Sequence, residues 1–241
     1  MAVPWLIDRK VRLPRVWSNR ELEKFASSFA GHVVNVSAWN DEDKEGRRYR
    51  EYFTGASSYS VTNYLPEAKG LQDDLENQIF LNLEEPLAGP LKRKFDVVFN
   101  HTVLEHVFEC AQAFRNLCEM SADIVIVVVP FIQHQHAAYG DYWRFTPEGI
   151  SRLFTKNGLE LLYINYNDEP NQSIYVIAIG SRMPDRWSQI RDHGDNKIAR
   201  LTEKVGNKLV RQGMLFRARE FVHHLLSKVR SGLLGARRRG G

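Results

Sequence analysis

The sequence predicts an α/β fold built on a mostly parallel β-sheet. Short runs of β-branched and aromatic residues between turn-forming residues are typical of buried parallel strands. These runs alternate with segments whose apolar residues recur at helical spacing, and two strand-like segments close the pattern as an antiparallel hairpin. With 241 residues, of which 43% are hydrophobic, the chain can bury one sizeable core and carry an appendage.

The first predicted elements are a helix and a buried strand. Ser18 and Glu21 have the spacing of a capping box, and apolar residues follow them at helical intervals. This pattern predicts a helix over about residues 19–29. Gly31 ends the helix, and the run HVVNV at 32–36 then predicts the first strand of the sheet.

The rest of the sheet follows from similar patterns. Further strands are predicted at 59–63, 79–83, 95–99, 123–130, 160–166 and 173–179, the last two flanking a turn-rich NDEPN segment as a hairpin. Helices are predicted at 107–120, which carries an apolar stripe, and at 147–156, where Thr146 is the expected N-cap. Parallel sheets bind ligands outside the carboxyl ends of their strands, so function is expected just after Val36, Asn63, Phe99 and Val129.

The sequence predicts a cytoplasmic protein with reduced cysteines and no membrane-spanning helix. The longest apolar run, around 124–130, is far shorter than the roughly 20 residues that a membrane-spanning helix needs. Charged residues interrupt the first 20 positions, which is unlike a secretory signal, so a cytoplasmic location is expected. Cys110 and Cys118 both lie in a segment of helical periodicity, and we interpret them as reduced packing residues.

Charge is distributed unevenly along the chain. From Asn196 onward there are twelve basic and two acidic residues, so this tail carries +10 and the preceding body −6. Apolar residues recur through the tail at near-helical spacing, which predicts one or two amphipathic helices interrupted near Gly206 or Gly213. Such a tail can bind an anionic membrane surface at the inner face, bind a protein partner, or pack on the sheet with a solvated basic face. Nucleic acid is disfavoured as a partner because the body is acidic.

Two motifs carry a resemblance to a known family. FDVVF at 95–99 followed by VLEHV at 103–107 resembles the fourth strand and following turn of class I S-adenosylmethionine-dependent methyltransferases. The segment VPF at 129–131, with His136 and then DYWRFTPEG at 141–149, is similar to the type 11-like branch associated with surface polysaccharide and glycan biosynthesis. The resemblance implies a Rossmann-like sheet, S-adenosyl-L-methionine as the cofactor, and a glycan or nucleotide-sugar-like substrate.

The resemblance also implies site residues. His106 and His136 are the expected catalytic groups, because an imidazole can accept a hydroxyl proton near neutral pH. The alternative for the LEH element is that Glu105 caps the next helix and His106 packs beside it. The predicted cofactor contacts are Ser37, Ala38, Asn63, Asn82, His101 and Thr102. The predicted substrate contacts are His134, Asp141, Tyr142 and Arg144.

The substrate contacts have a structural alternative too. Asp141 and Arg144 can form a structural ion pair, with Tyr142 and Trp143 buried to anchor the next helix. No metal is expected, because Thr102 stands where some relatives have an acidic residue that helps to bind a divalent cation.

The cofactor loop departs from the family pattern. Where the family has a glycine-rich turn of the DvGcGtG kind, this chain has NVSAWND at 35–41, and Trp39 could fill part of the pocket. Asn63 replaces the acidic residue that hydrogen-bonds the ribose, and Asn82 replaces an aspartate near adenine. The carboxylates of Asp41, Glu42 and Asp43 could reach the ribose instead.

Three regions and two functions follow. We expect an N-terminal extension with a helix at 1–30, a methyltransferase-like domain at 31–182 and a basic amphipathic tail at 183–241. The leading hypothesis is O-methylation of a sugar or glycan precursor. The alternative is a catalytically silent domain of the same fold that binds a partner.

Overall fold

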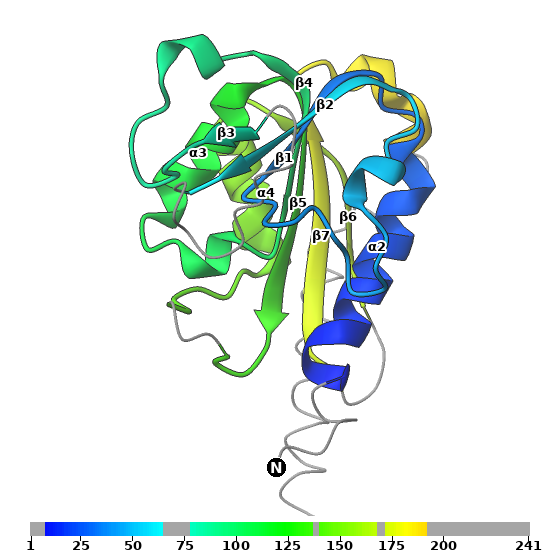
Figure 1. The fold of residues 1–241 in the computed structure, drawn as a ribbon, viewed down its shortest axis with the longest axis vertical. Helices are drawn as coiled ribbons and strands as arrows, with labels where there is room; N and C mark the ends of the chain where they lie inside the picture. Colours follow the sequence, from blue (N-terminus) through cyan, green and yellow to red (C-terminus); the bar gives the residue numbers. More distant parts are fainter. Residues whose placement is uncertain (1–7, 65–77, 137–139, 168–171, 192–241) are drawn as a thin grey trace, which may run out of the picture. The chain divides into compact units, whose positions relative to one another are not determined.

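One mixed sheet organises the molecule. The computed structural model describes residues 8–64, 78–136, 140–167 and 172–191. In this part of the chain a seven-stranded sheet has the order β3-β2-β1-β4-β5-β7-β6 (Figure 1). The strands are β1 (Gly31–Val36), β2 (Ala56–Asn63), β3 (Gln78–Phe80), β4 (Phe95–His101), β5 (Ser121–Ile132), β6 (Glu160–Tyr166) and β7 (Ile174–Ser181). Only β7 runs antiparallel to its neighbours β5 and β6, so the predicted α/β class, mostly parallel sheet and C-terminal hairpin are confirmed.

The strand predicted at 79–83 is wrong in its second half. β3 ends at Phe80, because it pairs only with the last three residues of β2. The chain then turns: Asn82 Oδ1 accepts a hydrogen bond from the main-chain nitrogen of Glu84 at 3.0 Å. Leu81 and Leu83 are nevertheless buried, so they supply core contacts from a turn and not from a strand.

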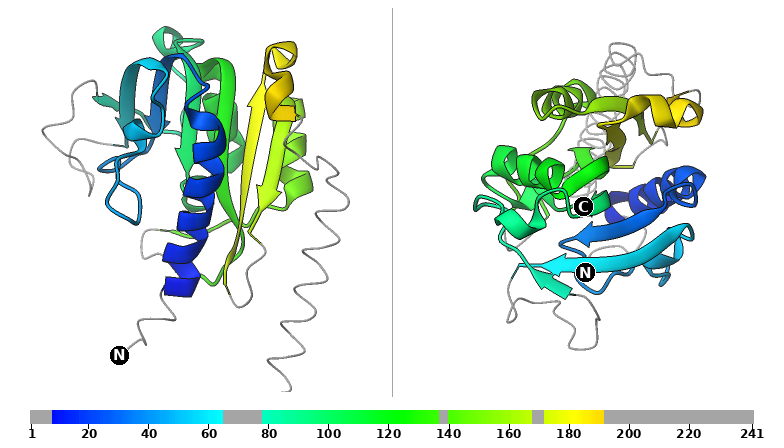
Figure 2. Two further views of the ribbon diagram at one scale, coloured as in Figure 1. Left: turned by 90° about the vertical axis from the view of Figure 1, so that its right-hand side faces the viewer. Right: turned by 90° about the horizontal axis from the view of Figure 1, so that it is seen from above.

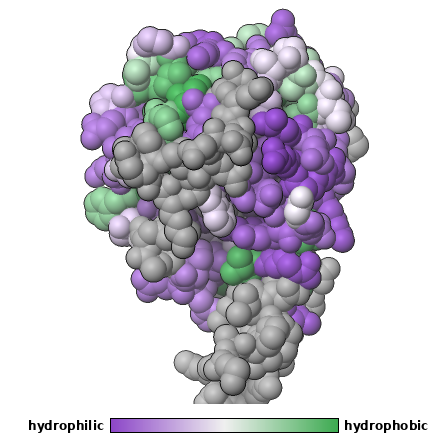
Figure 3. Space-filling model, in the orientation of Figure 1, coloured by the Kyte–Doolittle hydropathy of each residue, from purple (hydrophilic) through white to green (hydrophobic). Residues whose placement is uncertain are grey.

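Helices cover both faces of the sheet (Figures 1 and 2). α2 (Leu13–Ala26) lies on one face, and α3 (Cys110–Met120) and α4 (Pro147–Lys156) lie on the other. The shorter helices are the π-helix η1 (Asp8–Arg12), the 3-10 helices η2 (Tyr49–Glu51), η3 (Gly89–Leu91), η4 (Leu104–His106) and η5 (Pro184–Trp187), and α5 (Ser188–Arg191). The face of the molecule in Figure 3 is mainly hydrophilic, as expected when the apolar residues fill the space between helices and sheet.

The inner strand β5 is buried on both sides. Its side chains alternate between the two faces, and Ile124, Ile126 and Val128 join Phe25 and Phe29 in one apolar cluster under α2. The intervening valines of β5 are equally buried towards the opposite layer. The continuous run of β-branched residues in β5 predicted a strand correctly, because a strand that is buried on both faces has apolar side chains at successive positions.

The predicted capping box of the first helix is wrong. α2 begins at Leu13 with a proline in its first turn, so Ser18 and Glu21 lie inside the helix. The Ser18 hydroxyl donates to the Arg15 carbonyl at 2.8 Å. The Glu21 carboxylate accepts hydrogen bonds from Tyr163 Oη at 2.5 Å and from Lys24 Nζ at 2.6 Å. Ser18 Oγ also lies 2.8 Å from His101 Nε2, so each residue has a long-range contact that the local spacing does not reveal.

The predicted cap of α4 is confirmed. The Thr146 hydroxyl accepts a hydrogen bond from the main-chain nitrogen of Gly149 at 3.0 Å, and Pro147 opens the helix. Thr146 and Pro147 therefore fix the end of the loop that precedes α4, and both are recognisable from the local sequence.

Removing this cap should cost measurable stability. We expect Thr146→Ala to lower the free energy of unfolding by about 1 kcal/mol, because one main-chain donor of the first turn loses its acceptor. Urea unfolding followed by circular dichroism measures the change. Thr155→Ala is the control, since that exposed hydroxyl only donates back to the Ser151 carbonyl within the helix. Equal losses in the two variants would contradict the capping role.

A buried aspartate ties the segment after β7 to β5. The Asp123 carboxylate accepts hydrogen bonds from Ser181 Oγ, from the main-chain nitrogen of Met183 at 3.0 Å and from Trp187 Nε1 at 2.9 Å. The Trp187 ring also packs against Phe29, with ring centroids 5.2 Å apart. The predicted domain boundaries after residues 30 and 182 stay predictions.

Three further expectations can be compared with the described residues. Cys118 is buried and Cys110 is half-buried, both as free thiols, and burial raises the pKa of Cys118 to about 12, as suits a packing residue. No helix among these residues has the length and apolar character that a membrane crossing requires. The amphipathic helices predicted for the tail lie outside the described residues.

Candidate functional site

The predicted site residues lie at or just after the carboxyl ends of β1, β2, β3, β4 and β5. These strands are neighbours in the parallel part of the sheet, so the segments that follow them meet at one edge. β5 is the long strand whose arrowhead points to the lower part of Figure 1, where the chain continues towards α4. The geometry of this edge decides which predicted residues can act together.

The loop after β1 has an unusual backbone. Ser37, Trp39 and Asp41 adopt φ values of +56°, +54° and +57°, a left-handed conformation that non-glycine residues rarely take. Thr62 holds the start of the loop: its hydroxyl accepts from the Ser37 nitrogen and its carbonyl accepts from the Ala38 nitrogen, both at 3.0 Å. Cross-strand contacts with β2 therefore maintain a conformation that is intrinsically unfavourable.

Asp41 is the buried anchor of this loop. Its side chain is fully buried and accepts hydrogen bonds from Asn35 Nδ2 at 2.8 Å and Tyr59 Oη at 2.7 Å. Asp43 similarly accepts from Tyr52 Oη at 2.7 Å. The suggestion that the Asp41 and Asp43 carboxylates could reach a ribose is therefore corrected, because both are committed to folding the loop. Glu42 is exposed, and its carboxylate accepts a hydrogen bond from Asn40 Nδ2.

Asn63 and Trp39 are linked at the end of β2. The Asn63 Oδ1 accepts from the Trp39 main-chain nitrogen at 3.0 Å, and its Nδ2 donates to the Trp39 carbonyl at 3.3 Å. An amide oxygen has a second lone pair and an amide nitrogen a second hydrogen, so Asn63 can still bond a ligand hydroxyl. The Trp39 side chain is 50% exposed and is not packed into the core.

The other predicted cofactor contacts are placed differently. Asn82 uses its Oδ1 in the turn after β3. His101 is turned towards α2: its Nε2 lies 2.8 Å from Ser18 Oγ, and its Nδ1 lies 3.2 Å from Thr102 Oγ1. Thr102 has a φ of +53°, and its main-chain nitrogen donates to the Val128 carbonyl at 2.8 Å. A direct contact of His101 with a cofactor stays a prediction, and its observed partner is the helix.

Burial gives His101 a testable pH signature. Desolvation, reinforced by the positive charge of Arg15, holds the pKa of His101 well below its ordinary value. At low pH the imidazole of His101 therefore binds a proton in the unfolded chain but not in the folded chain. As a result, this group does not lower the free energy of unfolding above about pH 6.5, and lowers it progressively as the pH falls below that value. We expect up to about 1.4 kcal/mol of loss per pH unit from this group.

The measurement compares urea unfolding at several pH values in the native chain and in His101→Gln. The variant should show a shallower dependence on pH below about 6.5. His32, whose pKa burial also lowers, is unchanged in both proteins and cancels in the difference. Identical slopes would mean that His101 titrates normally in the folded chain.

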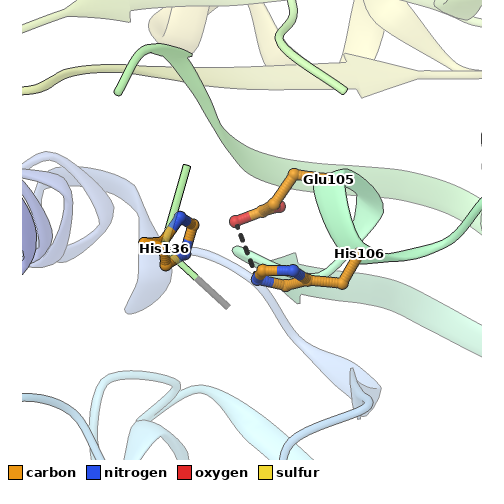
Figure 4. Close-up of side chains that lie close together, drawn as sticks. All are labelled: Glu105, His106 and His136. Atoms are coloured by element: carbon orange, nitrogen blue, oxygen red, sulfur yellow. Dashed lines mark ion pairs between the residues drawn. The ribbon is translucent and has the colours of Figure 1, made fainter. Parts of the chain in front are cut away.

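Glu105, His106 and His136 converge at the end of β4 (Figure 4). Glu105 and His106 come from η4, and His136 comes from the segment after β5. Glu105 is fully buried, which raises the pKa of its carboxyl group to about 8. His106 Nε2 lies 3.7 Å from Glu105 Oε1, and its Nδ1 lies 2.6 Å from the Gly140 carbonyl oxygen. The sequence had suggested Glu105 only as a helix cap.

An ion pair shapes the segment that carries His136. Arg144 Nη1 and Nη2 lie 2.5 and 2.8 Å from the two carboxylate oxygens of Asp141, and the guanidinium lowers the pKa of that carboxyl group to about 2. Arg144 also donates to the carbonyls of Gln133 and His134. The structural ion pair, one of the two readings of these residues, is thus present. Direct substrate contact by Asp141, Arg144 or His134 stays a prediction.

An exposed aromatic patch borders this cluster. Phe108, Tyr142 and Trp143 are 58%, 52% and 39% exposed. The Phe108 and Tyr142 rings pack edge to face with centroids 5.3 Å apart, and Trp143 Nε1 donates to the Phe108 carbonyl. The alternative in which Tyr142 and Trp143 are buried anchors is therefore wrong. Sequence reasoning missed Phe108, although its place directly after the LEHV motif was a usable signal.

Comparisons with known proteins agree with this architecture. No protein-family model and no curated protein matches the chain. A candidate methyltransferase from Bacillus halodurans C-125 superposes with a TM-score of 0.50 at 8% identity, covering 68% of this chain and 97% of its own. Magnesium protoporphyrin IX methyltransferase from Synechocystis PCC 6803, solved with bound S-adenosylmethionine, gives 0.51 at 11%, covering 76% and 86%. The fold is that of class I methyltransferases.

The left-handed residues of the loop after β1 coincide with the glycine positions of the pattern that the sequence resembles. Counted from Asn35, the family pattern DvGcGtG has glycine at the third, fifth and seventh places. Those places are Ser37, Trp39 and Asp41, the three left-handed residues. The chain therefore carries side chains in the left-handed conformation at the three positions where the pattern that it resembles has glycine.

Proposed function

We propose that the chain binds S-adenosyl-L-methionine at the loop after β1 and methylates a hydroxyl group of a sugar or glycan precursor. The supporting observation is the loop itself. Each left-handed non-glycine residue costs roughly 1–2 kcal/mol, and three occur at alternate positions of one short loop. Strain of this kind is usually retained where function needs the backbone shape.

The loop is compatible with the proposed cofactor. Its main chain is held by hydrogen bonds to Thr62 and Asn63. Asn63 keeps hydrogen-bonding capacity for a ribose hydroxyl, and the Trp39 side chain is exposed and not packed into the core. When bound, S-adenosyl-L-methionine supplies a methyl group activated by its sulfonium sulfur.

The acceptor hydroxyl is proposed to lie beside the Glu105, His106 and His136 cluster. Its oxygen forms the new bond to the methyl carbon as the carbon–sulfur bond breaks, so its proton must leave to a base. In the neutral His106 ring, Nδ1 donates to the Gly140 carbonyl, and this hydrogen bond favours the tautomer in which Nε2 is the basic nitrogen proposed to accept that proton. Alignment contributes most to such a displacement, and the base contributes less.

The aromatic patch supports the choice of a sugar acceptor. Exposed ring faces of Tyr142, Trp143 and Phe108 can pack against the apolar face of a sugar ring. The neighbouring polar side chains of His134, Asp141 and Arg144 are proposed to hydrogen-bond the hydroxyl groups of the sugar.

The second candidate is a silent binding domain. One observation favours it: side chains stand at all three glycine positions of the loop, and the third, Asp41, is locked in buried hydrogen bonds. In that case the domain binds a partner, and the loop conformation remains from a methyltransferase ancestor without binding a cofactor.

Labelled methyl transfer separates the two functions. The chain is incubated with methyl-labelled S-adenosyl-L-methionine and a panel of nucleotide sugars and oligosaccharides. We expect label in at least one acceptor, and a loss of about 100-fold or more in His106→Asn, which removes the proposed base, with the exposed Gln135→Ala as a control. Failure to bind the cofactor at all would favour the silent domain.

A further inference from the structure

We propose that Glu105, His106 and His136 form a binding site for one divalent transition-metal ion. Each residue offers one ligand atom, and the three atoms lie within 4.8 Å of one another. Figure 4 shows the three side chains directed towards a shared space from η4 and from the segment after β5. The sequence-based expectation of no metal considered Thr102 and did not foresee that His136 would join the two residues of η4.

The buried carboxylate is the first argument. Glu105 has no exposed surface, and neither of its side-chain oxygens has a hydrogen-bond partner among the described residues. A buried carboxyl group without a hydrogen bond is costly, and buried carboxylates are normally paired with cations or bound to metal ions. A cation between Glu105 and the two imidazoles would satisfy it.

The second argument is the way both imidazole rings are held. The His106 Nδ1 is bonded to the Gly140 carbonyl at 2.6 Å. The His136 Nδ1 lies 3.1 Å from Asp141 Oδ2, and Asp141 is in turn held by Arg144. A carbonyl or carboxylate on one ring nitrogen fixes the tautomer and presents the other nitrogen as a ligand, which is the usual outer-shell arrangement of metal-binding histidines.

Distances and ligand types indicate the kind of metal. Ligands about 2.1 Å from a tetrahedral ion are about 3.4 Å apart, close to the 3.7 Å between His106 Nε2 and Glu105 Oε1. The ligand atom of His136, whose side chain is 21% exposed, lies within 4.8 Å of those of the other two residues. Two imidazoles and one carboxylate favour zinc, manganese or iron over magnesium and calcium, which prefer oxygen ligands.

Three protein ligands leave a coordination position open. If the proposed methyl transfer holds, the acceptor oxygen would occupy that position and lose its proton more readily there. His106 would then act as a metal ligand instead of the base. This consequence rests on the proposed function, whereas metal binding itself does not.

The test is metal binding to the full chain without cofactor or acceptor. Calorimetric titration of metal-free protein with zinc should show one tight site, and cobalt should give the visible absorption of a low-coordinate site with nitrogen and oxygen ligands. We expect His136→Asn and Glu105→Gln each to weaken zinc binding by at least about 10-fold, and Asp141→Asn by about 10-fold or more through the ring it orients. His134→Asn is the matched control, because only the main-chain carbonyl of that exposed residue is used.

The outcomes are separable. Loss of the cobalt band in His136→Asn but not in His134→Asn supports the site, even if the buried Glu105→Gln variant fails to fold. No saturable uptake, or equal zinc affinity in His136→Asn and the native chain, would overturn it. Either result leaves cofactor binding to be judged separately, because the titration contains none.

Discussion

Asp123→Ala is expected to lower the free energy of unfolding by about 3 kcal/mol. The substitution removes the acceptor shared by Ser181, Met183 and Trp187 while their donors stay at least partly buried. Each donor left without a partner costs about 1 kcal/mol or more, and the segment after β7 loses its attachment to β5. Urea unfolding monitored by tryptophan fluorescence and circular dichroism measures the loss.

Asp185→Ala is the control for this experiment. Asp185 is an exposed residue of η5 in the same segment, so its removal should change stability by less than about 0.5 kcal/mol. A loss below about 1 kcal/mol in Asp123→Ala would mean that the hydrogen bonds around Asp123 are easily replaced by water.

The second large effect concerns the loop after β1. Ala38→Phe is expected to weaken binding of S-adenosylhomocysteine by at least about 100-fold, which corresponds to about 2.7 kcal/mol. Ala38 lies between the left-handed residues Ser37 and Trp39, where a bulky side chain would occupy the turn that the cofactor must approach. Calorimetry measures the affinity, and thermal unfolding checks that the variant is folded.

A phenylalanine farther along the loop provides the comparison. Glu45→Phe introduces the same side chain at an exposed position beyond the buried anchors Asp41 and Asp43, and should leave the affinity unchanged. Native affinity in Ala38→Phe would show that the cofactor does not contact this turn.

Much of the sheet could be predicted because its signals are local. β1, β4 and β5 are runs of β-branched and aromatic residues between turns, and such residues fit strands buried on both faces. The Thr146 cap of α4 was equally visible, since the hydroxyl and its main-chain partner are three residues apart. Local chemistry and final structure agree at these places.

The errors arise where residues distant in sequence determine the structure. Ser18 lies 83 positions from His101, and Glu21 lies 142 positions from Tyr163, so nothing in the local pattern marks them as helix-interior residues. Their polarity resembled a cap because caps use the same residue types.

The candidate site was predicted only in part, again because residues distant in sequence form it. His106 and His136 were chosen from motifs, but the burial of Glu105 and the joining of His136 to η4 depend on the packing of two separate loops. The left-handed loop was also hidden, since the hydrogen bond of Asp41 to Tyr59 stabilises a backbone that its residue types do not favour.

Calorimetric titration of the unmodified 241-residue chain with S-adenosylhomocysteine tests the central claim most directly. The account predicts a single saturable site with one ligand per chain and a matching increase in thermal stability, because a ligand that binds only the folded state stabilises it. No heat and no thermal shift at millimolar ligand would contradict the claim, and would leave a methyltransferase fold whose loop after β1 holds its shape without a cofactor.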